Sequence, residues 1–179
     1  MITGKNVRLR AIEREDIPRF VRWMNDPEVI ENLLMNYPLS HAMEEKWFDR
    51  QVETPPTVSQ VLAIETLVGA EWIHIGNCGL HFIEQVNNAA EFGIMIGEKD
   101  FWNKGLGREA AKLTLKHGFE NLNLNRIYLY VFDTNPRAQR SYEAVGFIKE
   151  GILRQGVYKN GRYIDVIVMS VLHSEWKGL

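Results

Sequence analysis

Two glycines separated by one residue, Gly105 and Gly107, stand at the start of a helical segment and constrain the chain more than any other feature. A β-rich stretch precedes them, and apolar side chains recur at helical spacing after them, up to Leu122. Glycine allows a close approach to the backbone, and the first turn of a helix carries unpaired N–H groups. The segment from Trp102 to Arg108 therefore predicts a loop and helix N-terminus that bind an anion such as phosphate.

Two other interpretations of this loop remain open on its residues alone. Gly105, Gly107 and Ala110 fit the dinucleotide-binding pattern G-x-G-x-x-G/A, with Asp133 after the next strand as the acid for a ribose. In that fold the glycines follow the first strand almost directly and a long sheet comes after them, whereas here the segment 98–104 intervenes. The second interpretation is a helix that is entered through a glycine turn and binds nothing.

The rest of the pattern predicts an α+β fold with one mixed central sheet of about seven strands, flanked by helices on both faces. Asp16 and Ser40 are expected to cap helices, and Asn160-Gly161 is a strong hairpin signal. A chain of 179 residues with 45% hydrophobic content can bury one core, so we expect a single domain over 1–179. The expected strands are 7–12, 60–67, 72–83, 89–97, 126–132, 147–153 and 163–172, and the expected helices are 17–24, 27–33, 41–52, 105–122 and 136–144.

Composition argues against several classes of protein. The net charge of -2, from 21 basic and 23 acidic residues, provides no surface for nucleic acid. Cys78 is the only cysteine and the five histidines show no ligand spacing, so we expect no metal site. The start lacks the apolar run of a signal peptide and no segment has the length of a membrane span, which favours a cytoplasmic protein without a membrane partner.

Two segments carry a resemblance to a known family. Trp102-Asn103-Lys104-Gly105-Leu106-Gly107-Arg108 resembles motif A of the GNAT acetyltransferase superfamily, Gln/Arg-x-x-Gly-x-Gly/Ala, with Trp102 in place of Gln or Arg. The segment from Asn135 to Phe147 resembles motif B, Asn-x-x-Ala/Ser-x-x-x-Tyr-x-x-x-Gly-Phe. The likeness covers nearly the whole chain and is greatest for the spermidine and ribosomal-protein alanine N-acetyltransferases.

The resemblance implies an acetyl-CoA site and names the residues that would form it. The family pairs the pantetheine arm with the backbone at the end of the strand 92–97, places the pyrophosphate on the glycine loop, and brings further contacts from the helix that starts at Asn135. The cofactor-binding residues implied are Met95, Ile96, Gly97, Trp102, Asn103, Lys104, Gly105, Leu106, Gly107, Arg108, Asn135, Arg137, Arg140 and Tyr142. The four basic residues among them also fit as ordinary solvated helix charges.

Two side chains are candidates for catalysis. Tyr142 occupies the position of the acid that protonates the departing thiolate, although the same spacing suits a core tyrosine. Glu91, before the cofactor strand, is a candidate general base, although it is equally suited to a solvated or ion-paired role and the amine can arrive already neutral. Cys78 has no activating partner in the sequence, which favours direct attack over an acyl-enzyme.

The resemblance therefore implies an N-acetyltransferase that moves an acetyl group from acetyl-CoA to a primary amine. The acceptor expected is a polyamine, a protein N-terminus or another small amine, and Glu28, Glu31, Glu44, Glu45 and Asp49 make the first-helix region acidic. A non-catalytic acyl-CoA-binding module is the alternative, and a dinucleotide-dependent oxidoreductase is a more distant one. An exposed strand near the C-terminus would allow pairing between subunits, which is compatible with a homo-oligomer.

Overall fold

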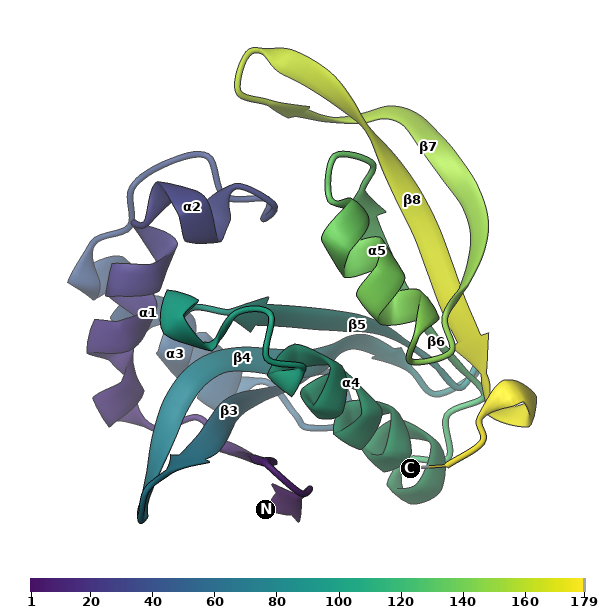
Figure 1. Cartoon of the computed structure of the whole chain (residues 1–179), viewed down its shortest axis with the longest axis horizontal. Helices are drawn as coiled ribbons and strands as arrows, with labels where there is room; N and C mark the ends of the chain where they lie inside the picture. The colour runs from purple at the N-terminus through teal and green to yellow at the C-terminus, as the bar shows by residue number, and fades with distance from the viewer. Residues whose placement is uncertain (179) are drawn as a thin grey trace.

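Eight strands form one continuous mixed sheet in the computed structural model, which describes residues 1–178 (Figure 1). Their order across the sheet is β1-β2-β3-β4-β5-β6-β8-β7. The sheet has one strand more than the seven expected, because β1 has only two residues and is recognisable only from its pairing with β2. The strands are β1 Ile2–Thr3, β2 Val7–Ala11, β3 Gln60–Val68, β4 Glu71–Glu84, β5 Ala89–Ile96, β6 Arg126–Phe132, β7 Ile148–Lys159 and β8 Arg162–Leu172.

The helices begin where the sequence predicts them, because short polar side chains stand at their starts. Ser40 Oγ accepts from the N–H of Met43, and Asn135 Oδ1 accepts from the N–H of Ala138. The helices are α1 Ile17–Met24, α2 Pro27–Ile30, α3 His41–Glu53, α4 Leu106–Lys116 and α5 Pro136–Glu143. Short helical turns lie at Arg14–Asp16, Lys99–Phe101, His117–Asn121 and His173–Glu175.

Asp16 precedes α1 as expected, but its side chain does not cap that helix. Its carboxylate is buried and accepts two hydrogen bonds from Arg10, at 2.7 and 2.8 Å, and one of 2.9 Å from Nδ1 of His74. The Arg10 guanidinium on β2 and the His74 ring on β4 occupy this carboxylate in place of the helix amides, and hydrogen bonds in which an ionised group takes part are the stronger ones. Asp16 therefore fastens the start of α1 to the sheet.

Helices cover both faces of the sheet, as expected. On one face Leu113 and Leu115 of α4 pack with Phe92 and Ile127 of the strands, in the larger core. On the other face α1 and α3 form a second core around Phe20, Trp23 and Phe48. Each buried aromatic or aliphatic side chain stabilises the fold by about 1.5–3 kcal/mol. The two cores hold the sheet rigid between them.

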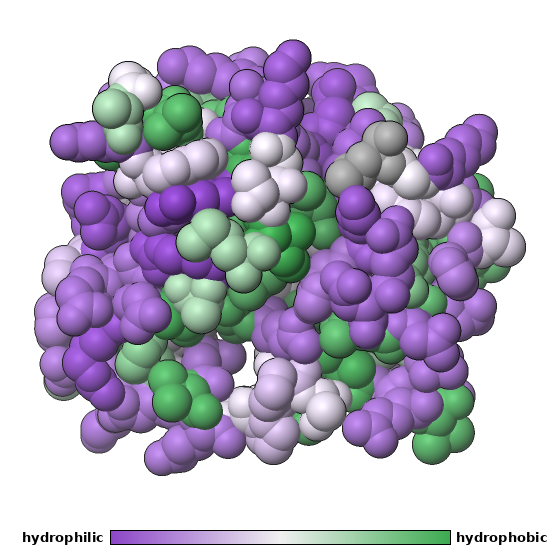
Figure 2. All heavy atoms as spheres, turned by 90° about the horizontal axis from the view of Figure 1, so that it is seen from below, coloured by the Kyte–Doolittle hydropathy of each residue, from purple (hydrophilic) through white to green (hydrophobic). Residues whose placement is uncertain are grey.

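Among the described residues, no helix is long and apolar enough to cross a bilayer. Polar residues predominate on the face drawn in Figure 2, with apolar residues near its middle and along part of its rim. Within residues 1–178, no three His, Cys, Asp or Glu side chains gather as metal ligands would.

Strands β5 and β6 pair in parallel over only three positions, Ala89↔Arg126, Ala90↔Ile127 and Glu91↔Tyr128. Beyond them β5 continues beside β4 to Ile96, while β6 continues beside β8 to Phe132. The two strands therefore part in the middle of the sheet, and backbone groups of β5 are left without a neighbouring strand. This opening is the feature of the fold that positions the site.

Candidate active site

The backbone of β5 presents alternate residues to the opening. The N–H of Gly97 donates to the carbonyl oxygen of Ile75 at 2.9 Å, and the register with β4 runs unbroken through Met95↔Asn77 and Gly93↔Gly79. In an antiparallel pair alternate residues direct their polar groups to the same neighbour. Gly93, Met95 and Gly97 thus face β4, and the amides of Ile94 and Ile96 face the opening.

Three residues predicted as cofactor contacts, Met95, Ile96 and Gly97, consequently differ in whether their backbone N–H group is free. The N–H of Gly97 donates to the carbonyl oxygen of Ile75, and that of Met95 faces β4. The N–H groups free for a backbone contact with the cofactor are therefore those of Ile94 and Ile96. Gly97 has another constraint, since a Cβ there would come within 2.1 Å of the Trp23 ring. The missing side chain lets α1 pack on the sheet.

The glycine loop forms a cradle of free backbone amides. The N–H groups of Asn103 to Arg108 have no acceptor in the described protein, and the N-cap residue of α4 is Gly105, which has no side chain to supply one. Gly105 has φ 78° and Asn103 has φ 61°, both in the left-handed region that suits these two residue types. Successive free amides at a helix N-terminus are the arrangement that binds phosphate.

Leu106 and Gly107 fix the position of the first turn of α4 in two different ways. Leu106 is buried in the larger core, which anchors the first turn of α4. A Cβ on Gly107 would lie 3.6 Å from Cγ1 of Ile96, an ordinary contact, so α4 begins directly against the end of β5. The cradle and the free amides of β5 are thus contiguous.

The basic residues near the cradle are exposed. Lys104 lies over the Phe101 ring at 5.2 Å, and the guanidinium of Arg137 lies 5.0 Å from the centre of the Trp102 ring. Arg108 and Arg140 make no ion pair within residues 1–178. Asn135 uses its side-chain oxygen on the start of α5.

Tyr142, on α5, stands on the core side of the opening. Its ring packs edge-on against Phe92, with centroids 6.3 Å apart, and against Phe147 at 5.8 Å. Its hydroxyl has no hydrogen-bond partner among the described residues, and burial raises the pKa of Tyr142 to about 12. The ring of Tyr142 thus packs with the core, while its hydroxyl makes no hydrogen bond to the described residues.

Glu91 lies at the point where β5 and β6 part, opposite His81 on β4 and Tyr128 on β6. Because Phe92 faces Tyr142, its neighbour Glu91 points to the opposite face of the sheet. Burial raises the pKa of Glu91, and its carboxylate makes no ion pair with any described residue. The predicted acid and base therefore lie on opposite faces of the same strand.

The surroundings of Cys78 disfavour a thiolate. The side chain is buried, its sulfur lies 3.3 Å from Oγ1 of Thr114, and burial raises the pKa of the thiol to about 12. A thiol that holds its proton this tightly does not attack a thioester.

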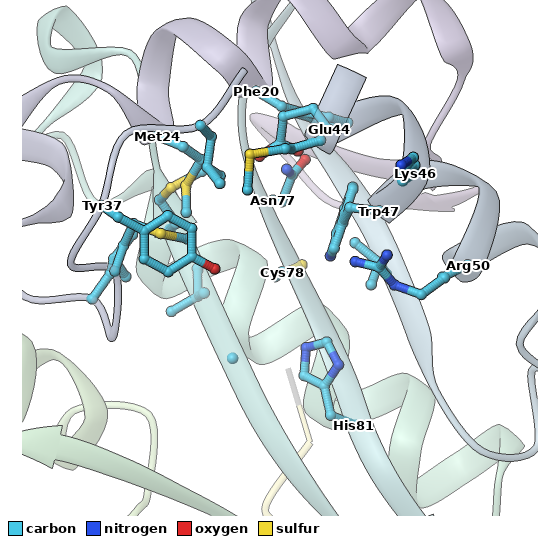
Figure 3. Close-up of a pocket in the computed structure, with 18 residues that line it drawn as sticks. Phe20, Met24, Tyr37, Glu44, Lys46, Trp47, Arg50, Asn77, Cys78 and His81 are labelled. Carbon is cyan, nitrogen blue, oxygen red and sulfur yellow. The ribbon is translucent and has the colours of Figure 1, made fainter. Parts of the chain in front are cut away.

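A cavity of about 500 Å³ opens on the α1–α3 face of the sheet, beside β5 (Figure 3). Sequence reasoning located an acidic region here but did not find the cavity, which is lined in part by residues of β4 and β5. Of the acidic residues predicted there, only Glu44 is among the described residues that line this cavity. Glu28 instead forms an ion pair with Lys99, and Asp49 forms one with Arg14. The lining residues are Phe20, Met24, Leu33, Met35, Tyr37, Leu39, Met43, Glu44, Lys46, Trp47, Arg50, Val61, Asn77, Cys78, His81, Gly93, Ile94 and Met95.

One wall of the cavity is held by a lysine distant in sequence. Lys159, at the tip of the β7–β8 hairpin that arches towards α2 in Figure 1, is buried. Its Nζ donates to the carbonyl oxygens of Ile30 at 2.8 Å, Met35 at 3.0 Å and Leu33. Leu33 and Met35 line the cavity, so the hairpin fixes the segment after α2 against it.

Comparison with known proteins agrees with this geometry. Residues 6–148 match the family model described as an acetyltransferase (GNAT) domain. The chain therefore belongs to the GNAT acetyltransferase family. Its GNAT relatives include an uncharacterized N-acetyltransferase p20 of Bacillus licheniformis, which is 31% identical over 95% of this chain and 94% of that protein. The spermidine N(1)-acetyltransferase of Vibrio cholerae is 32% identical over 94% of each chain.

Solved structures extend the match to the GNAT fold. The crystal structure of spermidine N-acetyltransferase from Vibrio cholerae in complex with CoA and spermine has a TM-score of 0.88 and 29% identity. The alignment covers 96% of this chain and 98% of that one. The dinucleotide interpretation of Gly105 and Gly107 is thus wrong, because the strand before them belongs to a GNAT sheet that opens after three parallel pairs.

Proposed function

We propose that this GNAT acetyltransferase takes the acetyl group from acetyl-CoA and transfers it to a primary amine by direct attack. The observation that supports this most is the parting of β5 and β6 beside the free amides of Asn103 to Arg108. A relative of the same fold is described in complex with CoA and spermine, which supports the same donor here. Cys78, buried and protonated, favours attack without an acyl-enzyme.

The residues present fit acetyl-CoA. The amides of the glycine loop and the first turn of α4 would hold its pyrophosphate, and Lys104, Arg108 and Arg140 are exposed nearby as counter-charges. The backbone N–H groups of Ile94 and Ile96 and the carbonyl of Ile94 would hydrogen-bond the pantetheine arm, with Asn135 on the facing helix. Bound there, acetyl-CoA supplies the thioester that an amine attacks.

The protein's own groups then stabilise charge and move protons. A backbone N–H of β5, from Ile94 or Ile96, donates to the oxygen that becomes negative. Tyr142 holds the proton for the departing sulfur. Its pKa of about 12 lies roughly 3.5 units above that of an ordinary thiol, a difference of about 5 kcal/mol, so transfer must accompany departure of the sulfur.

Glu91 is the proposed proton acceptor on the other face of the strand. Its raised pKa makes it a better base than an exposed glutamate, and it lies at the parting of the strands, three residues before Ile94 on β5. The acceptor enters from the cavity on this face and is a polyamine, a protein N-terminus or another small amine.

The test is release of free thiol from acetyl-CoA by the purified protein with a panel of primary amines. The panel contains spermidine, an alanine-terminated peptide and apolar monoamines, and a reaction without amine measures hydrolysis. Amine-dependent release supports the proposal. Binding of acetyl-CoA with no release above hydrolysis for every amine contradicts it and favours a non-catalytic acyl-CoA-binding module.

A further inference from the structure

Glu44 is the buried carboxylate of the cavity. It lies in the first turn of α3 with 4% of its surface exposed, and it lines the cavity on the side of Phe20 and Asn77 (Figure 3). None of the described residues gives it a hydrogen bond or an ion pair. Burial makes the charge of this carboxylate costly, and the Arg50 guanidinium offsets part of that cost without forming an ion pair. Its position therefore suits a cation supplied by a ligand.

The walls around Glu44 are apolar and adaptable. Four methionines, Met24, Met35, Met43 and Met95, line the cavity with the aromatic rings of Phe20 and Trp47. Methionine side chains are flexible and polarizable, so they fit irregular apolar ligands and contact aromatic ones well. Such apolar walls offer no counter-charge. An ammonium group bound against them, with no carboxylate beside it, would lose its hydration without gaining a partner, which is unfavourable.

The other charges of the cavity do not favour a polycation. Lys46 and Arg50, both on α3 and exposed, are its only lysine and arginine, so the described lining has two cations and a single carboxylate. His81 adds no negative charge: its Nδ1 lies 3.0 Å from Oγ of Ser59, and burial lowers its pKa. One ammonium finds a partner here, whereas a second and third meet apolar walls or like charges.

On the basis of the proposed function, we propose that the acceptor is a primary monoamine on an apolar body, with its ammonium group bound by the carboxylate of Glu44 and its body among the methionines. The cavity also includes Gly93, Ile94 and Met95 of β5, so an amine bound in it lies beside the strand whose amides face the opening. The cavity wall near Glu44, rather than the acidic exterior of the first-helix region, selects the substrate.

The experiment compares phenethylamine with spermidine. Thiol release with each amine gives kcat/KM, and calorimetry on the CoA-saturated protein gives the Kd of each amine independently of turnover. We expect phenethylamine to have a kcat/KM at least about tenfold higher and a Kd at least about tenfold lower than spermidine, the ratio lost with one unmatched charge. Equal values, or a preference for spermidine, would overturn the inference and leave acetyl transfer itself standing.

Two variants of α3 test the role of the carboxylate. Glu44→Gln removes the charge at constant shape and should weaken phenethylamine binding by about tenfold or more, with the Kd of acetyl-CoA unchanged. Glu53→Gln makes the same change at an exposed position of the same helix and should leave both affinities at the wild-type value. An unchanged Kd for phenethylamine in Glu44→Gln would also overturn the inference. If no amine releases thiol, the proposed function fails, while the calorimetric comparison still decides the inference.

Discussion

The indole Nε1 of Trp102 donates a hydrogen bond of 2.8 Å to the carbonyl oxygen of Ile96. Ile96 is the last residue of β5, and Trp102 precedes the glycine loop, so this bond joins the strand of the opening to the cradle. Arg137 lies over the same ring at 5.0 Å and adds the start of α5. One side chain thus sets the relative positions of three parts that would bind acetyl-CoA, in the place where the family's motif has Gln or Arg.

Replacing Trp102 should therefore weaken cofactor binding without unfolding the protein. Trp102→Phe retains an aromatic ring but removes the donor to Ile96, so the Kd of acetyl-CoA should rise about tenfold, measured by calorimetry. Trp72→Phe is the control, since Trp72 stacks with Arg8 away from the opening. Equal affinities of the two variants would show that the bond does not organise the site.

The two motif glycines should respond differently to alanine. Gly105 has φ 78°, so Gly105→Ala should lower the free energy of unfolding by about 1–2 kcal/mol. Gly107 lies in the first turn of α4 with room for a Cβ, so Gly107→Ala should unfold at or above the wild-type denaturant midpoint. The opposite order of stabilities would contradict the assignment of the left-handed turn.

Removal of the Tyr142 hydroxyl should affect turnover and not binding. Tyr142→Phe retains the ring packing on Phe92, so kcat should fall about a hundredfold or more with the Kd of acetyl-CoA unchanged. Because the pKa of Tyr142 is about 12, the wild-type rate should show no loss from this group below about pH 11. Tyr163→Phe, at an exposed ring of β8, is the control, and full activity of Tyr142→Phe would exclude the acid role.

Lys159 should control acceptor affinity from outside the cavity. Lys159→Met leaves three carbonyl oxygens of the segment after α2 without their donor, so it should cost about 1–3 kcal/mol of stability. The KM for the amine should rise several-fold, while the Kd of acetyl-CoA stays unchanged. Lys149→Met, at an exposed position of the same strand, should change neither the stability nor the amine KM. An unaltered amine KM in Lys159→Met would show that the hairpin does not influence acceptor binding in the cavity.

Glu44 should make stability depend on pH in a predictable direction. Burial raises its pKa above 4.5, so the folded protein keeps this proton to a higher pH than the unfolded chain. The free energy of unfolding therefore loses a contribution as the pH rises from the ordinary value through the raised one. Glu44→Gln should be more stable than the wild type near pH 7, by a margin that shrinks towards about pH 4 in urea titrations. A stability difference between the two proteins that does not change with pH would mean that Glu44 has the same pKa in the folded and unfolded chain, as an exposed glutamate does.

Much of the fold followed from local patterns. The starts of α3 and α5 were predictable because Ser40 and Asn135 accept from amides within three residues of themselves. The hairpin at Asn160-Gly161 was predictable because both residues adopt positive φ, at 51° and 80°. The glycine turn before α4 was predictable in the same way, since Gly105 with its positive φ governs only its own neighbourhood.

The sequence by itself thus determined the elements, their order and the family's two motifs, all of which depend on contacts between residues close in the chain. Only the tertiary structure decided which amides of β5 are free, that Asp16 serves Arg10 and His74, and that Glu44 faces a cavity while Glu28 and Asp49 form surface ion pairs. These properties depend on strand register and on burial. Both arise from packing between segments far apart in the chain, and no local pattern records which carboxylate that packing removes from water.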